Sequence, residues 1–165
     1  MELEIKNRGF TLIELLVAMA AFSLIIVSMA GIATSVIKSQ RKAFALQKVQ
    51  ESTRYILESI SKEIRMSQIN SLSSDDINTL SIVNSKNENV EYLFNSNRMT
   101  RKVDANDWEY ISPSNIDLTG SFYIRKNSSP NRSFVTIVIK AESQGSRAEE
   151  NAEIYLQNSV SSRPF

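Results

Sequence analysis

One apolar run near the N-terminus constrains the fold of this chain more than any other feature. It extends from Phe10 to Ile37, about 28 residues, and exceeds the roughly 20 apolar residues with which an α-helix crosses a bilayer. Its single ionisable side chain is Glu14, near the N-terminal end. A carboxylate within a membrane segment costs roughly 2.5–3.5 kcal/mol on insertion scales. The run therefore predicts a membrane-spanning helix, and Glu14 indicates a function beyond simple anchoring.

A short motif introduces this run. Residues 6–14 read Lys-Asn-Arg-Gly-Phe-Thr-Leu-Ile-Glu, so that cations, a glycine, an aromatic residue and an acid occur in a fixed order. This order resembles the leader and cleavage motif of type IV prepilins and type II secretion pseudopilins. The resemblance implies that residues 1–9 are a leader carrying the charges Lys6 and Arg8. A membrane prepilin peptidase and methyltransferase would cut after Gly9 on the cytoplasmic side and N-methylate Phe10.

The same resemblance gives Glu14 a part in assembly. Phe10 would start the mature helix, and its freed amine would be a cation one helical turn from the Glu14 carboxylate. When subunits pack side by side, Glu14 of one chain would neutralise the Phe10 ammonium of its neighbour. A mismatched register would leave both charges unpaired in an apolar core, which is costly. We expect Phe10 and Glu14 to set the axial register of a fibre.

Two simpler interpretations of the run stay open. It could be a plain single-pass anchor that carries a glutamate, or a secretory signal peptide cut near Ala30 or Ala33. The cost of the buried charge disfavours the first, and the length of the run disfavours the second. Lys and Arg residues flank both ends of the run, so charge counting gives no orientation. The orientation with the head outside the cytoplasm follows from the prepilin resemblance.

Composition narrows the function classes. The chain contains no cysteine and no histidine, which removes disulfides, thiolate sites, thiol catalysis and the commonest general base. No nucleophile–base pair or phosphate-binding loop is visible, so we expect no enzyme activity and no cofactor. A net charge of +1 gives no field that would attract nucleic acid.

The helical period continues beyond the apolar run. Apolar residues recur every three or four positions, which defines one stripe on an otherwise polar helix. No proline interrupts the chain from Phe10 to Ile69, whereas Gly31 is either a soft spot or a small residue that permits close helix packing. The polar run 67–76 should end the helix. The stripe comprises Leu46, Val49, Thr53, Ile56, Leu57, Ile60 and Ile64.

Beyond the polar run 67–76 the hydrophobic period changes to two, which predicts short strands separated by turns and hence an antiparallel sheet. The run 134–139 is the most apolar and should lie near the sheet centre. Gly120 is a candidate bulge in the strand 116–124. In the last strand, Ile154 and Leu156 should face the core. The predicted strands are 79–83, 90–94, 99–103, 116–124, 134–139 and 152–160.

A looser resemblance covers the second half of the chain. The segments 90–94, 99–101, 116–122 and 156–163, together with 51–65, are similar to J-type minor pseudopilins and W-type minor pilins. This likeness implies a low-copy subunit that primes or caps a fibre.

Other candidate sites are weaker. The acidic pairs Asp75-Asp76 and Asp104/Asp107 lack calcium-loop spacing, so we expect no metal site. Trp108 and Tyr110 suggest a loop anchor or a subunit contact. A basic patch beside Phe122 and Tyr123 would suit single-stranded DNA, but its charges are scattered and a solvated sheet face is the favoured interpretation. That patch would comprise Arg98, Arg101, Lys102, Arg125, Lys126 and Arg132.

Together these patterns predict an α+β, pilin-like chain whose long N-terminal helix packs on a small antiparallel β head. We divide it into a leader (1–9), a transmembrane or filament-core helix (10–37), the amphipathic half of that helix (38–70) and the head (71–165). The prediction is a structural minor pilin or pseudopilin held in the cytoplasmic membrane before it enters a fibre. Its partners would be the peptidase, other pilins and an inner-membrane assembly platform. The competing interpretation is a membrane-tethered extracytoplasmic binding domain, or a DNA-uptake pilus subunit.

Overall fold

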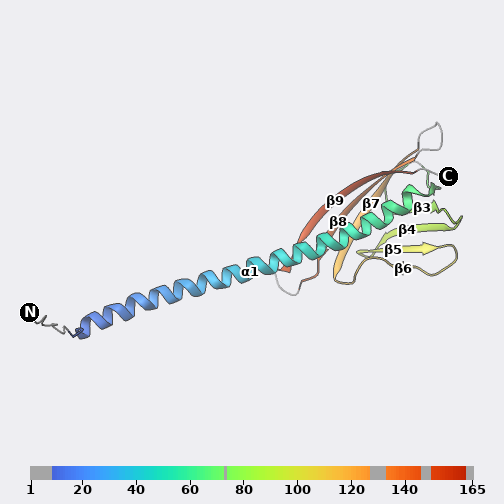
Figure 1. The fold of residues 1–165 in the computed structure, drawn as a ribbon. Coiled ribbons are helices and arrows are strands. Elements are labelled where there is room, and N and C mark those ends of the chain that lie inside the picture. The colour runs from blue at the N-terminus through green and yellow to red at the C-terminus, as the bar shows by residue number, and fades with distance from the viewer. Residues whose placement is uncertain (1–8, 73, 127–132, 146–149, 163–165) are drawn as a thin grey trace, which may run out of the picture. The chain divides into compact units, whose positions relative to one another are not determined.

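The computed structural model describes residues 9–72, 74–126, 133–145 and 150–162. One long helix, α1 (Leu12–Arg65), precedes the strands of the head (Figure 1). The chain divides into two compact units, residues 1–40 and 41–165, and each is considered by itself. The α+β class and the antiparallel head are confirmed. The head contains two sheets, where the sequence suggested one.

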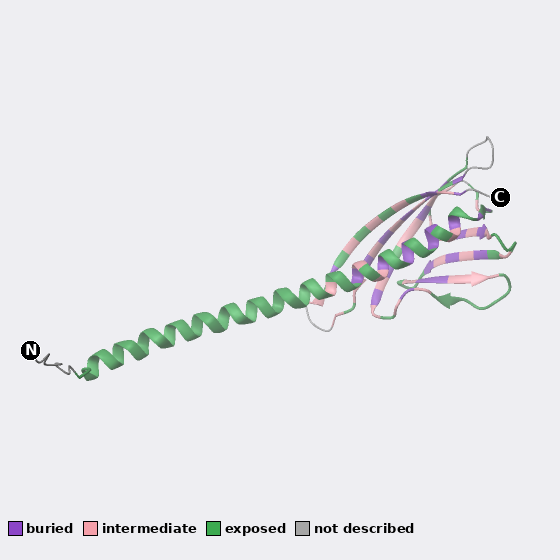
Figure 2. Cartoon of the chain, in the orientation of Figure 1, coloured by how far each residue is buried: buried purple, intermediate pink, exposed green. Residues whose placement is uncertain are grey.

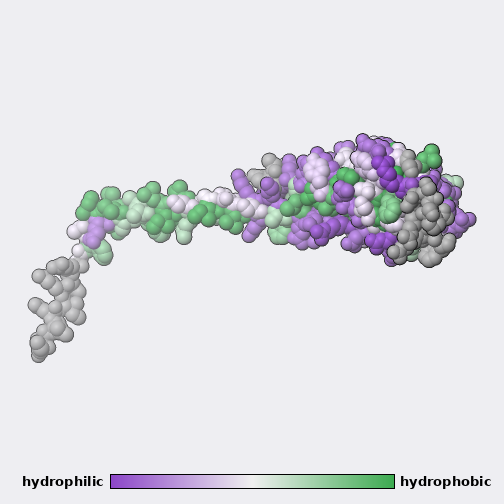
Figure 3. All heavy atoms as spheres, turned by 90° about the horizontal axis from the view of Figure 1, so that it is seen from above, coloured by the Kyte–Doolittle hydropathy of each residue, from purple (hydrophilic) through white to green (hydrophobic). Residues whose placement is uncertain are grey.

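The first unit consists of the N-terminal part of α1, and all of its described residues are exposed. Figure 2 shows this part of the helix in one colour, and Figure 3 shows apolar side chains over its visible face. The hydroxyls of Ser23, Ser28 and Thr34 each donate to a backbone carbonyl three or four residues earlier, at 2.8–2.9 Å. These bonds satisfy the polar groups within the helix, as a membrane segment requires. The helix continues through Gly31 without a break.

The second unit contains two antiparallel sheets. The five-stranded sheet has the order β1-β3-β4-β5-β6, and the four-stranded sheet has the order β2-β7-β8-β9. Strand β8 lies between β7 and β9, so the prediction that it is central is confirmed. The strands are β1 (Gln68–Ile69), β2 (Ser74–Ile77), β3 (Thr79–Val83), β4 (Asn89–Asn95), β5 (Arg98–Val103), β6 (Glu109–Tyr110), β7 (Ile116–Lys126), β8 (Ser133–Ser143) and β9 (Glu153–Ser161).

The hairpin between β4 and β5 follows directly from its sequence. Its two loop residues, Ser96 and Asn97, have positive φ angles of 51° and 59°. Two such residues form the type I′ turn, whose twist matches that of the flanking strands. Asn97 tolerates this conformation well, because its short polar side chain can bond locally. The turn sets the register in which Tyr92 lies opposite Arg101.

The stripe predicted for the second half of α1 is nearly correct. Its members from Val49 to Ile64 are buried, and Ser61 joins them. Leu46 was assigned wrongly, because 43% of it is exposed; Ala45 packs against the core instead. The helix ends at Arg65, as expected, but the polar run after it contains β1 and most of β2 rather than a loop alone.

Gly120 does not form a bulge. It keeps a regular register opposite Ile139, and the register shift lies in β2, between Ser74 and Ile77. A Cβ on Gly120 would meet the Val138 carbonyl oxygen at 2.4 Å and the Phe94 ring at 2.8 Å. Phe94 comes from the five-stranded sheet and packs on Phe122 of the other, with ring centroids 5.1 Å apart. The glycine therefore provides space where the two sheets meet.

Candidate processing and assembly segment

The N-terminal end of α1 begins with a side-chain cap. Thr11 precedes the first helical residue, Leu12, and its Oγ1 accepts a hydrogen bond from the Glu14 backbone N–H at 3.3 Å. The Thr11 carbonyl accepts the first helical bond, from the Leu15 N–H at 3.2 Å. Thr11 is thus the N-cap, which satisfies one of the free N–H groups at the helix start. In the full chain the helix begins at Leu12, two residues after Phe10, so a mature helix that starts at Phe10 stays a prediction.

The predicted cleavage bond lies ahead of this cap. Gly9 and Phe10 are outside the helix and exposed, with 84% of Phe10 accessible. Because Gly9 and Phe10 lie outside the helix, a peptidase need not break helical hydrogen bonds to reach the bond between them. The bond after Gly9 is therefore accessible in this conformation. The leader charges Lys6 and Arg8 fall outside the residues that the structure describes.

Glu14 occupies the first turn of α1. A carboxylate there interacts favourably with the N-terminal end of the helix dipole. Thr11 and Glu14 together have the Thr-x-x-Glu spacing of a capping box, of which the Thr11 half is formed. This spacing was not among the predicted features, although it is visible in the sequence and identifies Thr11 as the cap.

The residues that follow form a helix with no core of its own. Among the described residues, α1 is the one helix long and apolar enough to cross a membrane, and none of its most apolar window is buried. Such a surface requires either lipid or other apolar helices around it. The large exposed side chains of this segment are Leu12, Ile13, Leu15, Leu16, Val17, Met19, Phe22, Leu24, Ile25, Ile26, Val27, Met29, Ile32, Val36 and Ile37.

Comparison with known protein families identifies this segment. Residues 5–30 match the model of the prokaryotic N-terminal methylation motif. The chain carries a prepilin-type N-terminus. The match supports the prepilin and pseudopilin family predicted from the sequence, together with its characteristic cleavage and methylation. No curated protein and no solved structure matches the chain. The likeness of the head to J-type and W-type subunits stays a prediction.

The amphipathic part of α1 is joined to the five-stranded sheet by an ionic network. Arg101 donates to both carboxylate oxygens of Glu63, at 2.7 and 3.1 Å, and the Tyr92 hydroxyl donates to the same carboxylate. Burial raises the pKa of Glu63, but the hydrogen bonds from Arg101, Tyr92 and Asn84 and the charge of Arg101 together lower it by more. Burial and the Glu63 carboxylate raise the pKa of Tyr92. Glu63 is therefore held as an anion and Tyr92 as a neutral donor.

The other candidate sites are not assembled. Asp75 pairs with Arg125 at 2.8 Å, and Asp104 accepts the Asn89 backbone N–H. Within the described parts of the chain, no three potential metal ligands cluster.

The residues of the proposed DNA-binding patch do not share one surface. Arg101 binds Glu63, the guanidinium of Arg98 stacks on Tyr110 at 3.8 Å, and Arg125 and Lys126 lie on the other sheet. Phe122 is fully buried and cannot stack on a base. Arg132 falls outside the described residues.

Proposed function

We propose that this chain is a minor pilin or pseudopilin, a non-enzymatic subunit of a type IV pilus or type II secretion pseudopilus. It is cut after Gly9, methylated at Phe10, and held in the cytoplasmic membrane with its head outside the cytoplasm. It then enters a fibre through packing of the segment 10–37. The observation that carries this proposal is the methylation motif at residues 5–30, at the start of a helix whose apolar side chains up to Ile37 are all exposed.

In this proposal Glu14 sets the register of assembly. Its carboxylate would pair with the Phe10 ammonium of a neighbouring subunit. As a low-copy subunit, the chain would prime or cap the fibre. Removing one partner of a buried pair leaves the other charge uncompensated, at a cost of several kcal/mol. We therefore expect Glu14→Ala to lower incorporation into the fibre at least tenfold while leaving cleavage unchanged.

The first experiment is the intact mass and N-terminal residue of the protein from its native membrane. A chain that starts at Phe10 and is heavier by one methyl group supports the proposal. A chain that keeps Met1 refutes processing and favours a tethered domain, and a start after Ala30 or Ala33 means a secreted protein.

The Glu14→Ala variant then separates a fibre subunit from a tethered domain. For an anchor alone, removing the charge should preserve or improve membrane insertion. Glu58→Ala is a matched control, because Glu58 is an exposed acid on the same helix beyond the apolar run. Equal incorporation of the two variants would contradict a role for Glu14 in assembly.

A further inference from the structure

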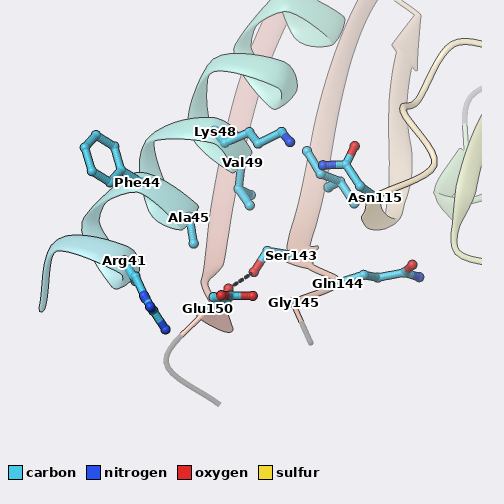
Figure 4. Close-up of a pocket in the computed structure, with 11 residues that line it drawn as sticks. Arg41, Phe44, Ala45, Lys48, Val49, Asn115, Ser143, Gln144, Gly145 and Glu150 are labelled. Carbon is cyan, nitrogen blue, oxygen red and sulfur yellow. Dashed lines mark hydrogen bonds between the residues drawn. The ribbon is translucent and has the colours of Figure 1, made fainter. Parts of the chain in front are cut away.

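A pocket of about 320 Å³ lies in the second unit, where α1 passes the end of the four-stranded sheet (Figure 4). Its apolar wall consists of Ala45 and Val49 from α1 and Ile116 at the start of β7. Val49 and Ile116 are each 1% exposed, so this wall belongs to the core. The volume is at the lower end of the range found for small-ligand pockets.

The opposite wall is fixed by hydrogen bonds beyond the end of β8. The Ser143 hydroxyl donates to the Glu150 backbone carbonyl and accepts the Ala152 N–H at 2.8 Å. A Cβ on Gly145 would lie 2.4 Å from the Cβ of Glu150, so the glycine permits their close approach. Glu150 is therefore held at the pocket by the backbone around it.

Three charged side chains line the pocket: Arg41 and Lys48 from α1, and Glu150 opposite. Figure 4 shows Lys48 reaching over the apolar wall toward Asn115. In the part of the chain that the structure describes, none of the three takes part in an ion pair. Two cations and one anion around an apolar wall complement a ligand with a phosphate, an ammonium and an apolar portion.

The place of the pocket in the sequence indicates the source of such a ligand. Arg41 comes four residues after Ile37, where the apolar run ends. Phe44 lines the pocket and is 68% exposed. Aromatic and basic residues directly after a membrane span are typical of the headgroup region of a bilayer.

We propose that this pocket binds the headgroup of a zwitterionic phospholipid that carries a primary ammonium. Arg41 and Lys48 bind its phosphate, Glu150 accepts hydrogen bonds from its ammonium, and Phe44 contacts its glycerol and upper acyl chains. The inference rests on membrane anchoring by the segment 10–37 and does not require fibre assembly. A failure of assembly would therefore leave it standing.

Native mass spectrometry of the full chain released from nanodiscs tests this inference. Phosphatidylethanolamine, phosphatidylcholine and phosphatidylglycerol are supplied at equal mole fraction, and retained lipids are counted. We expect retention of phosphatidylethanolamine about tenfold above the other two, because one charge-assisted hydrogen bond has roughly that effect. Phosphatidylcholine has no N–H to donate, and phosphatidylglycerol has no ammonium.

Substitutions test which residues bind the ammonium of the lipid and which bind its phosphate. Glu150→Gln should lower retention of phosphatidylethanolamine to the level of phosphatidylcholine, and Arg41→Gln with Lys48→Gln should lower retention of all three lipids. Lys42→Gln is the matched control, because it removes an exposed cation beside Arg41 that does not line the pocket. It should retain lipids as the unmodified chain does.

Three results would overturn the inference. Equal retention of the three lipids would contradict headgroup recognition. A loss with Lys42→Gln as large as with the double variant Arg41→Gln and Lys48→Gln would indicate general attraction to the bilayer surface. Displacement of the lipid by an equal concentration of water-soluble glycerophosphoethanolamine would show that the membrane is not the required source.

Discussion

The ionic network between α1 and the five-stranded sheet gives a sharp test of how the head is held together. We consider Glu63→Gln, which keeps the size of the side chain and removes its charge. The Glu63 and Arg101 side chains are 21% and 29% exposed, so both are mainly desolvated. In a chain without cysteine, this network attaches the helix to the strands together with the apolar core and the hydrogen bond from Asn158 to Ser61.

The magnitude follows from the contacts that are lost. The glutamine keeps one acceptor oxygen, but its amide group faces the Arg101 guanidinium, which has no acceptor. Hydrogen bonds to charged groups contribute about 1.5–3 kcal/mol, and partial exposure favours the lower part of that range. We therefore expect a loss of about 2 kcal/mol in the free energy of unfolding, equivalent to a fall of roughly 8 °C in Tm for a head of this size.

The effect should depend on pH with a defined sign. Because the pKa of Glu63 is lowered in the folded state, its contribution is present above its ordinary value, about 4.3, and is lost as the pH falls through the folded value. The difference between the variant and the unmodified chain should thus be full at neutral pH and shrink below about pH 4. The Glu63→Gln variant cannot lose stability by protonation of residue 63, so its stability should fall less steeply in acid than that of the unmodified chain.

The assay is urea unfolding of the full chain in detergent, followed by the fluorescence of Trp108, the single tryptophan. Glu58→Gln is the control, because Glu58 is exposed on the same helix. The reasoning is refuted if the two variants unfold at the same urea concentration. It is also refuted if Glu63→Gln loses stability in acid as steeply as the unmodified chain.

Two further predictions concern packing in the head. Ile60→Ala should cost about 2–5 kcal/mol, because Ile60 is 1% exposed, whereas Leu46→Ala should cost less than about 1 kcal/mol in the same urea titration. Gly120→Ala should cost about 1–3 kcal/mol, because its Cβ would overlap the Val138 carbonyl and the Phe94 ring. Gly31→Ala, where a Cβ meets nothing within 4 Å, should leave unfolding of the head unchanged; a comparable loss at both glycines would contradict the packing argument.

The sequence predicted the features that depend on local periodicity. The apolar stripe of α1 and the longer strands could be located because each repeats its pattern several times. The short strands β1 and β6 could not be located, because two residues do not establish an alternation. Likewise, the packing of Ala45 against the core in place of Leu46 depends on where the strands end along the helix, and periodicity carries no information about that.

Features that depend on contacts between distant segments were not predictable. Glu63 and Arg101 are 38 positions apart, and both belong to a helix or strand with other charges nearby. Gly120 interrupts an alternating strand, which locally resembles a bulge, yet its small size is required by Phe94 from the other sheet. The N-terminal processing and assembly segment, in contrast, was predictable from the sequence, because residues 6–14 form one continuous motif.

Cleavage itself has an electrostatic consequence under the proposed function. The exposed apolar side chains between Phe10 and Ile37 can be covered by lipid or by neighbouring helices. Because both environments are apolar, the apolarity of these side chains does not strongly favour either one. Glu14 distinguishes the two environments, because a neighbouring subunit can supply a cation. That cation exists only after the bond following Gly9 is cut, since Phe10 carries an amide N–H in the uncut chain. Assembly of an uncut chain would therefore bury the Glu14 carboxylate without its partner, at a cost of several kcal/mol for each subunit. On this argument, cleavage does more than remove the leader: it creates the charge that makes the fibre more favourable than the membrane.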